Sequence, residues 1–257
     1  FILIGITITV VLISNSNTSE SSEFAEINCN YNIQSANEEI DILGEDFRKK
    51  SIFDIYIDGN KIEFAKKYKF EKIKIYNIKY KFYENFDMDY MFKNIYSLIS
   101  VELISKQNST ITSMISSFEN CVNLESFKIT EGFDISQIKS ISKLFYNTSL
   151  NVFNIDNFDI NNVEDVSYMF SFSNLEEINL NKLNTKNVKN MSHMFFNCQK
   201  LTSLDLSNLD TNKVENMSNL FANCESLISL DLSNFNTGSV KICLICCIIA
   251  FLCQMLN

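Results

Sequence analysis

The pair Cys243-x-x-Cys246 has a spacing that can bind a metal ion or form a redox-active disulfide. Its neighbours are almost all apolar, and the chain has a single histidine, His193, to add to such a site. His193 occupies a variable position of a repeat, so we interpret it as an exposed side chain rather than as a base or ligand. The chain has only 5 Gly, which leaves no Gly-rich phosphate loop, and it contains no nucleophile elbow. We therefore expect no enzyme activity, no catalytic residue, no cofactor and no metal site.

Repeated polar side chains offer recognition instead of catalysis. In each copy of Leu-x-x-Leu-x-Leu, the residues between the leucines alternate with them, as on the outward face of a half-buried strand. Stacked carboxylates and amides there can hold a basic partner or a weakly bound cation. The alternative is a solvated polar ladder without a partner. The candidate binding residues are Glu102, Lys128, Asn154, Asp156, Asn179, Asn181, Asp205, Ser207, Asp231 and Ser233.

The elements that would position these residues repeat along the chain. Val188-x-x-Met191-x-x-Met194-Phe195 places apolar residues at the spacing of a short helix, and Val214 begins a close copy. One strand and one short helix for each 25 or 26 residues fall within the range of leucine-rich repeats. The first leucines of the units are Leu98, Leu124, Leu150, Leu175, Leu201 and Leu227.

A single unit cannot bury its own apolar face, whereas stacked units form a continuous core. The repeat therefore predicts an α/β solenoid: a right-handed coil with a parallel β-sheet on one face and short helices on the other. Cys121, Cys198 and Cys224 share one repeat position, which the two intervening units give to Asn147 and Phe172. We expect a column of buried free thiols there, because a disulfide framework would not reuse one position on successive units.

The segment from Leu201 to Cys224, LTSLDLSNLDTNKVENMSNLFANC, resembles the repeat of the BspA-like leucine-rich-repeat surface proteins. The units at Leu175 and Leu201 match this phrase closely, and the resemblance covers roughly residues 88–240. It implies an exported, non-enzymatic cell-surface protein that acts in adhesion or ligand binding. It implies no catalytic residue, because the motif is structural.

The distribution of apolar, alternating and repeated residues divides the chain into four segments. Residues 1–23 begin with an apolar run typical of a signal peptide, with an uncleaved anchor or a buried element as alternatives. Residues 24–90 form a β-rich N-terminal cap, or an independent β-domain, with a hairpin turn at Asp58-Gly59. Residues 91–240 are the solenoid, of about six units. Residues 241–257 are an apolar, Cys-rich tail, interpreted as a truncated or misread end, a membrane anchor or a capping helix.

Charge narrows the choice of partners. The net charge is −9, acidic residues outnumber lysines across the repeats, and the lysines after Arg48 are interleaved with Asp and Glu. This distribution argues against nucleic acid. We expect a secreted or cell-surface protein that binds a protein or glycan through the concave sheet, with membrane attachment through the terminal apolar segments. The alternative is an intracellular scaffold for protein–protein interaction. On a eukaryotic secretory route, Asn108 and Asn147 are glycosylation candidates.

Overall fold

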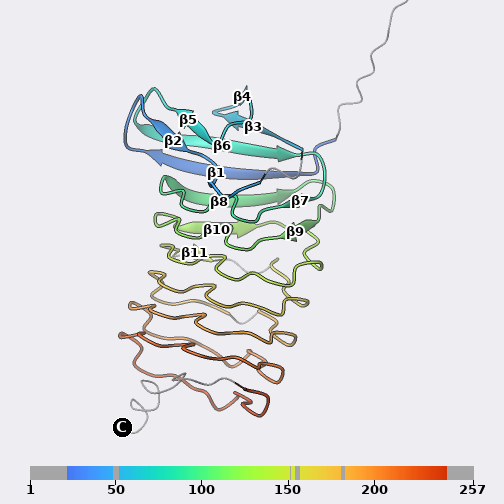
Figure 1. Ribbon diagram of the computed structural model, residues 1–257, viewed down its shortest axis with the longest axis vertical. Coiled ribbons are helices and arrows are strands. Elements are labelled where there is room, and N and C mark those ends of the chain that lie inside the picture. The colour runs from blue at the N-terminus through green and yellow to red at the C-terminus, as the bar shows by residue number, and fades with distance from the viewer. Residues whose placement is uncertain (1–21, 49–51, 151, 154–156, 181–182, 242–257) are drawn as a thin grey trace, which may run out of the picture.

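The computed structural model describes residues 22–48, 52–150, 152–153, 157–180 and 183–241. Within these ranges it consists of β-strands, turns and loops, and no α-helix is present. The N-terminal strands lie at one end, and a single stack of coils, each one winding of the chain, leads away from them (Figure 1). The strands are β1 (Ala25–Ile33), β2 (Glu39–Asp41), β3 (Phe53–Ile57), β4 (Asn60–Ile62), β5 (Lys67–Lys69), β6 (Lys74–Phe82), β7 (Phe86–Asp87), β8 (Leu98–Ser105), β9 (Ile111–Ser113), β10 (Ser126–Ile129) and β11 (Val152–Phe153).

The N-terminal strands follow the period-two pattern of their sequence. In β3 and in most of β6, buried residues alternate with partly exposed ones, as expected for strands with one face on the core. The hairpin at Asp58-Gly59 is confirmed: Ile57 pairs with Asn60, and both turn residues have positive φ, 47° and 85°. This two-residue turn suits the right-handed twist of the strands it joins.

One sheet joins the N-terminal strands to the repeats, in the order β11-β10-β8-β1-β6-β3-β4. Strand β1 is antiparallel to both β6 and β8, whereas β8, β10 and β11 are parallel to one another. Because β1 pairs along β8, it covers a strand edge that would otherwise present unpaired N–H and C=O groups. Two small sheets, β2 with β5 and β7 with β9, complete the paired strands of the described residues.

A column of buried phenylalanines runs through the stacked coils. Successive ring centroids lie 5.5, 5.6, 5.9, 5.7 and 5.7 Å apart, and neighbouring ring planes differ by 12° or less. Each ring is at most 5% exposed. The stacking at the spacing of the sequence repeat shows that each unit is one coil. The column contains Phe92, Phe118, Phe145, Phe170, Phe195 and Phe221.

The prediction of a short helix in each unit is wrong, because turns occupy these positions. His193 and Asn197 have φ of 57° and 58°, and a left-handed pair at this spacing recurs in neighbouring coils. A helix requires consecutive right-handed residues, so two left-handed residues only four positions apart prevent it. The backbone amides bond to the next coil instead, as in Phe170 N–H to Met194 O at 3.0 Å. Two successive turns produce the same apolar spacing as a helix face, which explains the error.

The thiol column is confirmed, with a corrected register. Cys121, Cys198 and Cys224 are free and buried, and each Sγ donates a hydrogen bond to a backbone carbonyl of the preceding coil, at 2.9–3.1 Å. In the two intervening coils, Thr148 and Ser173 follow the column phenylalanine at the same distance, so they take this position instead of Asn147 and Phe172. In these two coils the segment between this position and the first leucine of the next unit is one residue shorter. Counting back from that leucine therefore gave Asn147 and Phe172.

We expect the buried thiols to make stability fall above about pH 9. Burial raises the pKa of Cys198 from 9.0 to about 11 and that of Cys224 to about 12. The unfolded thiols ionise near pH 9 whereas the folded ones stay protonated, so the unfolded state binds fewer protons and the free energy of unfolding decreases as pH rises. Urea titrations between pH 7 and pH 11 measure this decrease. A free energy of unfolding unchanged at pH 10.5 would contradict it.

Candidate functional site

The outward side of the seven-stranded sheet carries a group of polar side chains, which we call the sheet face. Cross-strand pairing aligns them in rows, because residues paired across adjacent strands point to the same side. One row runs Lys79, Asn28, Glu102, Lys128 through β6, β1, β8 and β10. The row beside it runs Asn77, Asn30, Ser100, Ser126 through the same strands. These eight residues line a shallow cavity of about 400 Å³.

Hydrogen bonds hold the second row in place. Asn77 Nδ2 donates to Asn30 Oδ1 at 3.3 Å, and Asn30 Nδ2 donates to Ser100 Oγ at 2.8 Å. Asn28 Oδ1, in the first row, is buried and has no hydrogen-bond partner among the described residues. Because this oxygen is closed to solvent, a partner could reach it only after neighbouring side chains moved, so a partner on the sheet face would contact the accessible atoms of the row.

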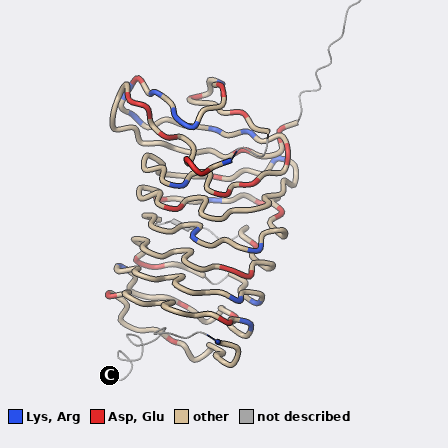
Figure 2. The backbone as a smooth tube through the Cα atoms, viewed as in Figure 1, with Lys and Arg blue, Asp and Glu red and all other residues tan. Residues whose placement is uncertain are grey.

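The charges of the sheet face differ in how far they are neutralised. Lys79 Nζ lies 3.1 Å from Glu26 Oε1. Burial of Glu26 alone would raise its pKa, but the hydrogen bond and the charge of Lys79 outweigh burial, and the pKa lies below 4.5. Glu102 and Lys128 are paired across adjacent strands, yet no ion pair or side-chain hydrogen bond of either occurs within the described part of the chain. They are therefore the charges most available to a partner. Lysines and acidic residues mix over the N-terminal strands (Figure 2).

The sequence predicted Glu102 and Lys128 but missed their neighbours Asn28 and Lys79. The missed residues lie in strands that precede the repeats, and their alternation with buried residues along 25–33 and 74–82 was the available signal. What the alternation could not show is the order of the strands, which places β1 between β6 and β8.

The other predicted binding residues lie farther along the stack. Asn179 is exposed. Asp205 and Asp231 are exposed, and each accepts a hydrogen bond from a backbone amide two residues later, at Ser207 (2.9 Å) and Ser233 (2.8 Å). Hydrogen bonds from these serines lower the pKa of both carboxyls. The two carboxylates thus stabilise local turns. Asn154, Asp156 and Asn181 lie outside the described residues, as do the tail cysteines and the N-terminal apolar run.

The two glycosylation candidates differ in their surroundings. Asn108 is exposed, with φ of 51°. Asn147 is half-buried, and its Nδ2 donates to Asn120 Oδ1 at 3.0 Å in a ladder that continues to Asn94. A glycan on Asn147 would be attached to the same nitrogen and would leave it a single hydrogen for this bond between coils.

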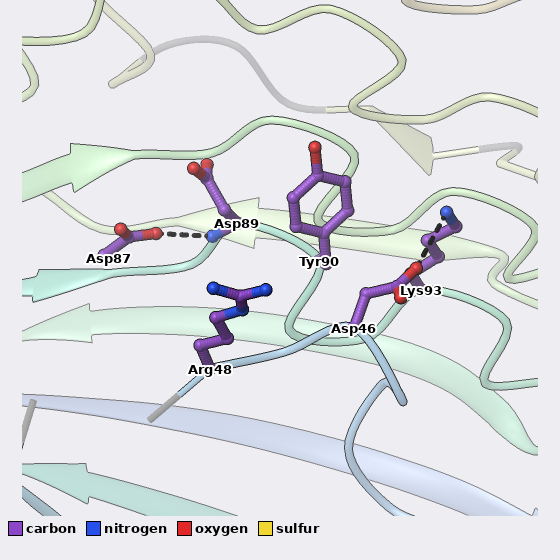
Figure 3. A pocket seen from close by; sticks show the side chains of 6 residues that line it. All are labelled: Asp46, Arg48, Asp87, Asp89, Tyr90 and Lys93. Carbon is purple, nitrogen blue, oxygen red and sulfur yellow. Dashed lines mark hydrogen bonds and ion pairs between the residues drawn. The ribbon is translucent and has the colours of Figure 1, made fainter. Parts of the chain in front are cut away.

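A second cavity, of about 410 Å³, lies where the loop after β2 meets the first coil (Figure 3). It is lined by Arg48, the only arginine of the chain, together with Tyr90, Lys93 and three aspartates. Asp46 pairs with Lys93 at 3.0 Å, and Asp87 Oδ1 accepts the Asp89 backbone amide at 2.7 Å. Asp89 Oδ1 accepts the Ile115 amide at 2.7 Å. These carboxylates therefore serve the fold at the start of the stack.

His193 is half-buried rather than fully exposed. Its ring stacks on Tyr168 with centroids 4.3 Å apart, and its Nε2 lies 2.9 Å from Asn219 Nδ2. Burial lowers the pKa of His193, which favours the neutral ring. Within the described ranges, no group of three or more His, Cys, Asp or Glu residues is placed to hold a metal ion. Nor does that part of the chain contain a helix that could cross a membrane.

Comparison with known proteins gives a family but no function. No curated protein and no solved structure matches the chain. One family model, described as "Mycoplasma protein of unknown function, DUF285", matches it twice, over residues 62–178 and 171–244. The two matches cover most of the chain, including β6, β8 and the stacked coils. The chain therefore belongs to the DUF285 family of Mycoplasma proteins of unknown function.

Proposed function

We propose that this protein is a non-enzymatic binding protein of the cell surface or secreted fraction, which recognises a protein or glycan through the sheet face. The observation that carries the proposal is the polar row of Lys79, Asn28, Glu102 and Lys128 on the outward side of the sheet, with two charges left without partners among the described residues. The strands beneath it are fixed by the core, so the row is held before any partner arrives. A pre-organised polar surface loses less conformational entropy on binding.

The resemblance to BspA-like leucine-rich-repeat surface proteins supports the same proposal. On this interpretation the coils form a right-handed leucine-rich-repeat solenoid in which turns replace the usual short helices, and the N-terminal strands form its cap. Adhesion is the function that the resemblance implies. Stacked repeats suit this role because they present an extended surface rather than an enclosed pocket.

A charge exchange on the sheet face should weaken binding. We expect the double variant Glu102→Lys, Lys128→Glu to bind about tenfold more weakly to plates coated with extracellular-matrix proteins or mucin, because it reverses the charge pattern that a partner must match. The matched control is Glu164→Lys, Lys189→Glu, which exchanges an exposed ion pair of 2.6 Å on later coils and also keeps the net charge. Equal binding by both variants, or no binding by the unmodified protein, would count against the proposal.

Antibody staining separates this proposal from the alternative, an intracellular scaffold. Antibodies raised against residues 98–240 should stain intact source cells if the protein is exported. Staining that requires permeabilisation and lies outside the secretory compartments would favour the scaffold. This measurement does not depend on the identity of the ligand.

A further inference from the structure

A third cavity lies beside the C-terminal end of β1, lined by residues other than those of the sheet face, and we call it the corner pocket. It has a volume of about 530 Å³, within the range of ordinary ligand pockets. The end of β1 and the segment leading through β2 form one wall, and the first two coils form the other where they turn into β8 and β10. Its polar and aromatic lining includes Gln34, Glu39, Asp41, Asn94, Tyr96 and Asn123.

Three amides of the corner pocket are each held at one end and have no partner at the other end among the described residues. Asn123 Nδ2 donates to Tyr96 O at 2.7 Å, which leaves Asn123 Oδ1 as an acceptor. Asn94 Oδ1 accepts from Asn120 Nδ2 at 2.9 Å, which leaves the Asn94 amide as a donor. Gln34 Nε2 donates to Asn32 Oδ1 at 2.6 Å, which leaves Gln34 Oε1. The pocket thus offers oriented donors and acceptors together.

An aromatic ring and an unsatisfied hydroxyl complete the lining. Tyr96 is 59% exposed, so much of its ring is open to a ligand. The hydroxyl of Ser97, a lining residue, is buried and has no hydrogen-bond partner among the described residues. An exposed ring beside mixed donors and acceptors suits a ligand with an apolar face and a rim of hydroxyl groups.

The charge of the lining selects among such ligands. Glu39 and Asp41 line the pocket, and none of the described residues that line it is Lys or Arg. Asp41 is paired with Lys67 at 3.6 Å across the β2–β5 pair, which leaves Glu39 as the lining carboxylate without an ion pair among the described residues. Its negative charge disfavours anionic ligands.

We infer that the corner pocket binds a neutral saccharide. The C–H face of a pyranose ring would lie on Tyr96, and its hydroxyl groups would exchange hydrogen bonds with the amides of Asn94, Asn123 and Gln34. The carboxylates of Glu39 and Asp41 would accept further hydroxyl hydrogens and exclude sialylated or sulfated sugars. This site is separate from the sheet face, so it can exist whether or not the sheet face binds a partner.

The test begins with the full chain on an array of neutral, sialylated and sulfated glycans. We expect the neutral glycans to bind best. For the best neutral saccharide, calorimetry should show binding about tenfold weaker for Tyr96→Ala, whereas Tyr96→Phe should keep most of the affinity because it keeps the ring. The matched control is Tyr56→Ala, which removes a half-exposed tyrosine from β3.

Three results would overturn the inference: no binding to any neutral glycan at millimolar concentration, a preference for anionic glycans or for a lysine-rich peptide, or equal affinity of Tyr96→Ala and the unmodified protein. Urea denaturation of each variant shows whether it is folded, and the exposure of Tyr96 leads us to expect an unchanged midpoint. The variant Glu102→Lys, Lys128→Glu should keep full saccharide affinity. The saccharide affinity of this variant separates failure of the corner pocket from failure of the sheet face.

Discussion

Replacing Phe145 with alanine should lower the free energy of unfolding by about 4 kcal/mol. Phe145 is fully buried, and its ring lies 5.6 Å from Phe118, 5.9 Å from Phe170 and 5.0 Å from Phe127. Its removal would leave a cavity in the middle of the aromatic column. The column cannot close over the cavity, because the backbone hydrogen bonds between coils fix their separation.

Urea denaturation followed by circular dichroism measures this loss. Because each coil contacts mainly its neighbours, a break in the column should also reduce cooperativity and broaden the transition. Phe172→Ala is the matched control: Phe172 is 38% exposed, so we expect a loss of about 1 kcal/mol or less. Equal losses for the two variants would show that the column does not hold the stack together.

Gly44→Ala should destabilise the protein by about 3 kcal/mol, the upper part of the range for overpacking. A Cβ at Gly44 would lie 2.2 Å from Tyr90 O and 3.1 Å from the backbone N and O of Lys93. The Gly44 amide also donates to Met91 O at 2.7 Å. The added methyl group meets backbone rather than a mobile side chain, so the N-terminal segment would have to move away from the first coil.

Gly59→Ala is the control for this variant. Gly59 has φ of 85° in the hairpin turn, and a Cβ there would have no neighbour within 4 Å. Its substitution therefore adds conformational strain of about 1 kcal/mol without a clash. Free energies of unfolding from urea titrations compare the two. If Gly44→Ala costs no more than Gly59→Ala, the close approach of Gly44 to the first coil is not a tight constraint.

The sequence predicted those parts of the fold that depend on local patterns. Alternation along 53–64 and the Asp58-Gly59 turn predicted the β3–β4 hairpin, and the shared position of Cys121, Cys198 and Cys224 predicted buried thiols. The turns in place of helices were not predictable in the same way. Left-handed residues such as Tyr168 and Phe172 are neither Gly nor Asn, so their residue types do not reveal their backbone conformation.

Periodicity alone was enough to predict the repeat length, the buried residues in each coil and two members of the sheet face, Glu102 and Lys128. The neighbours of these two residues depend on how the strands pair. The pairing of β1 with both β6 and β8 places Asn28 next to residues far away in the sequence, and the corner pocket forms from β1, β2 and two coils. Such contacts depend on strand order and long-range hydrogen bonding, which a local pattern of apolar and polar residues does not encode.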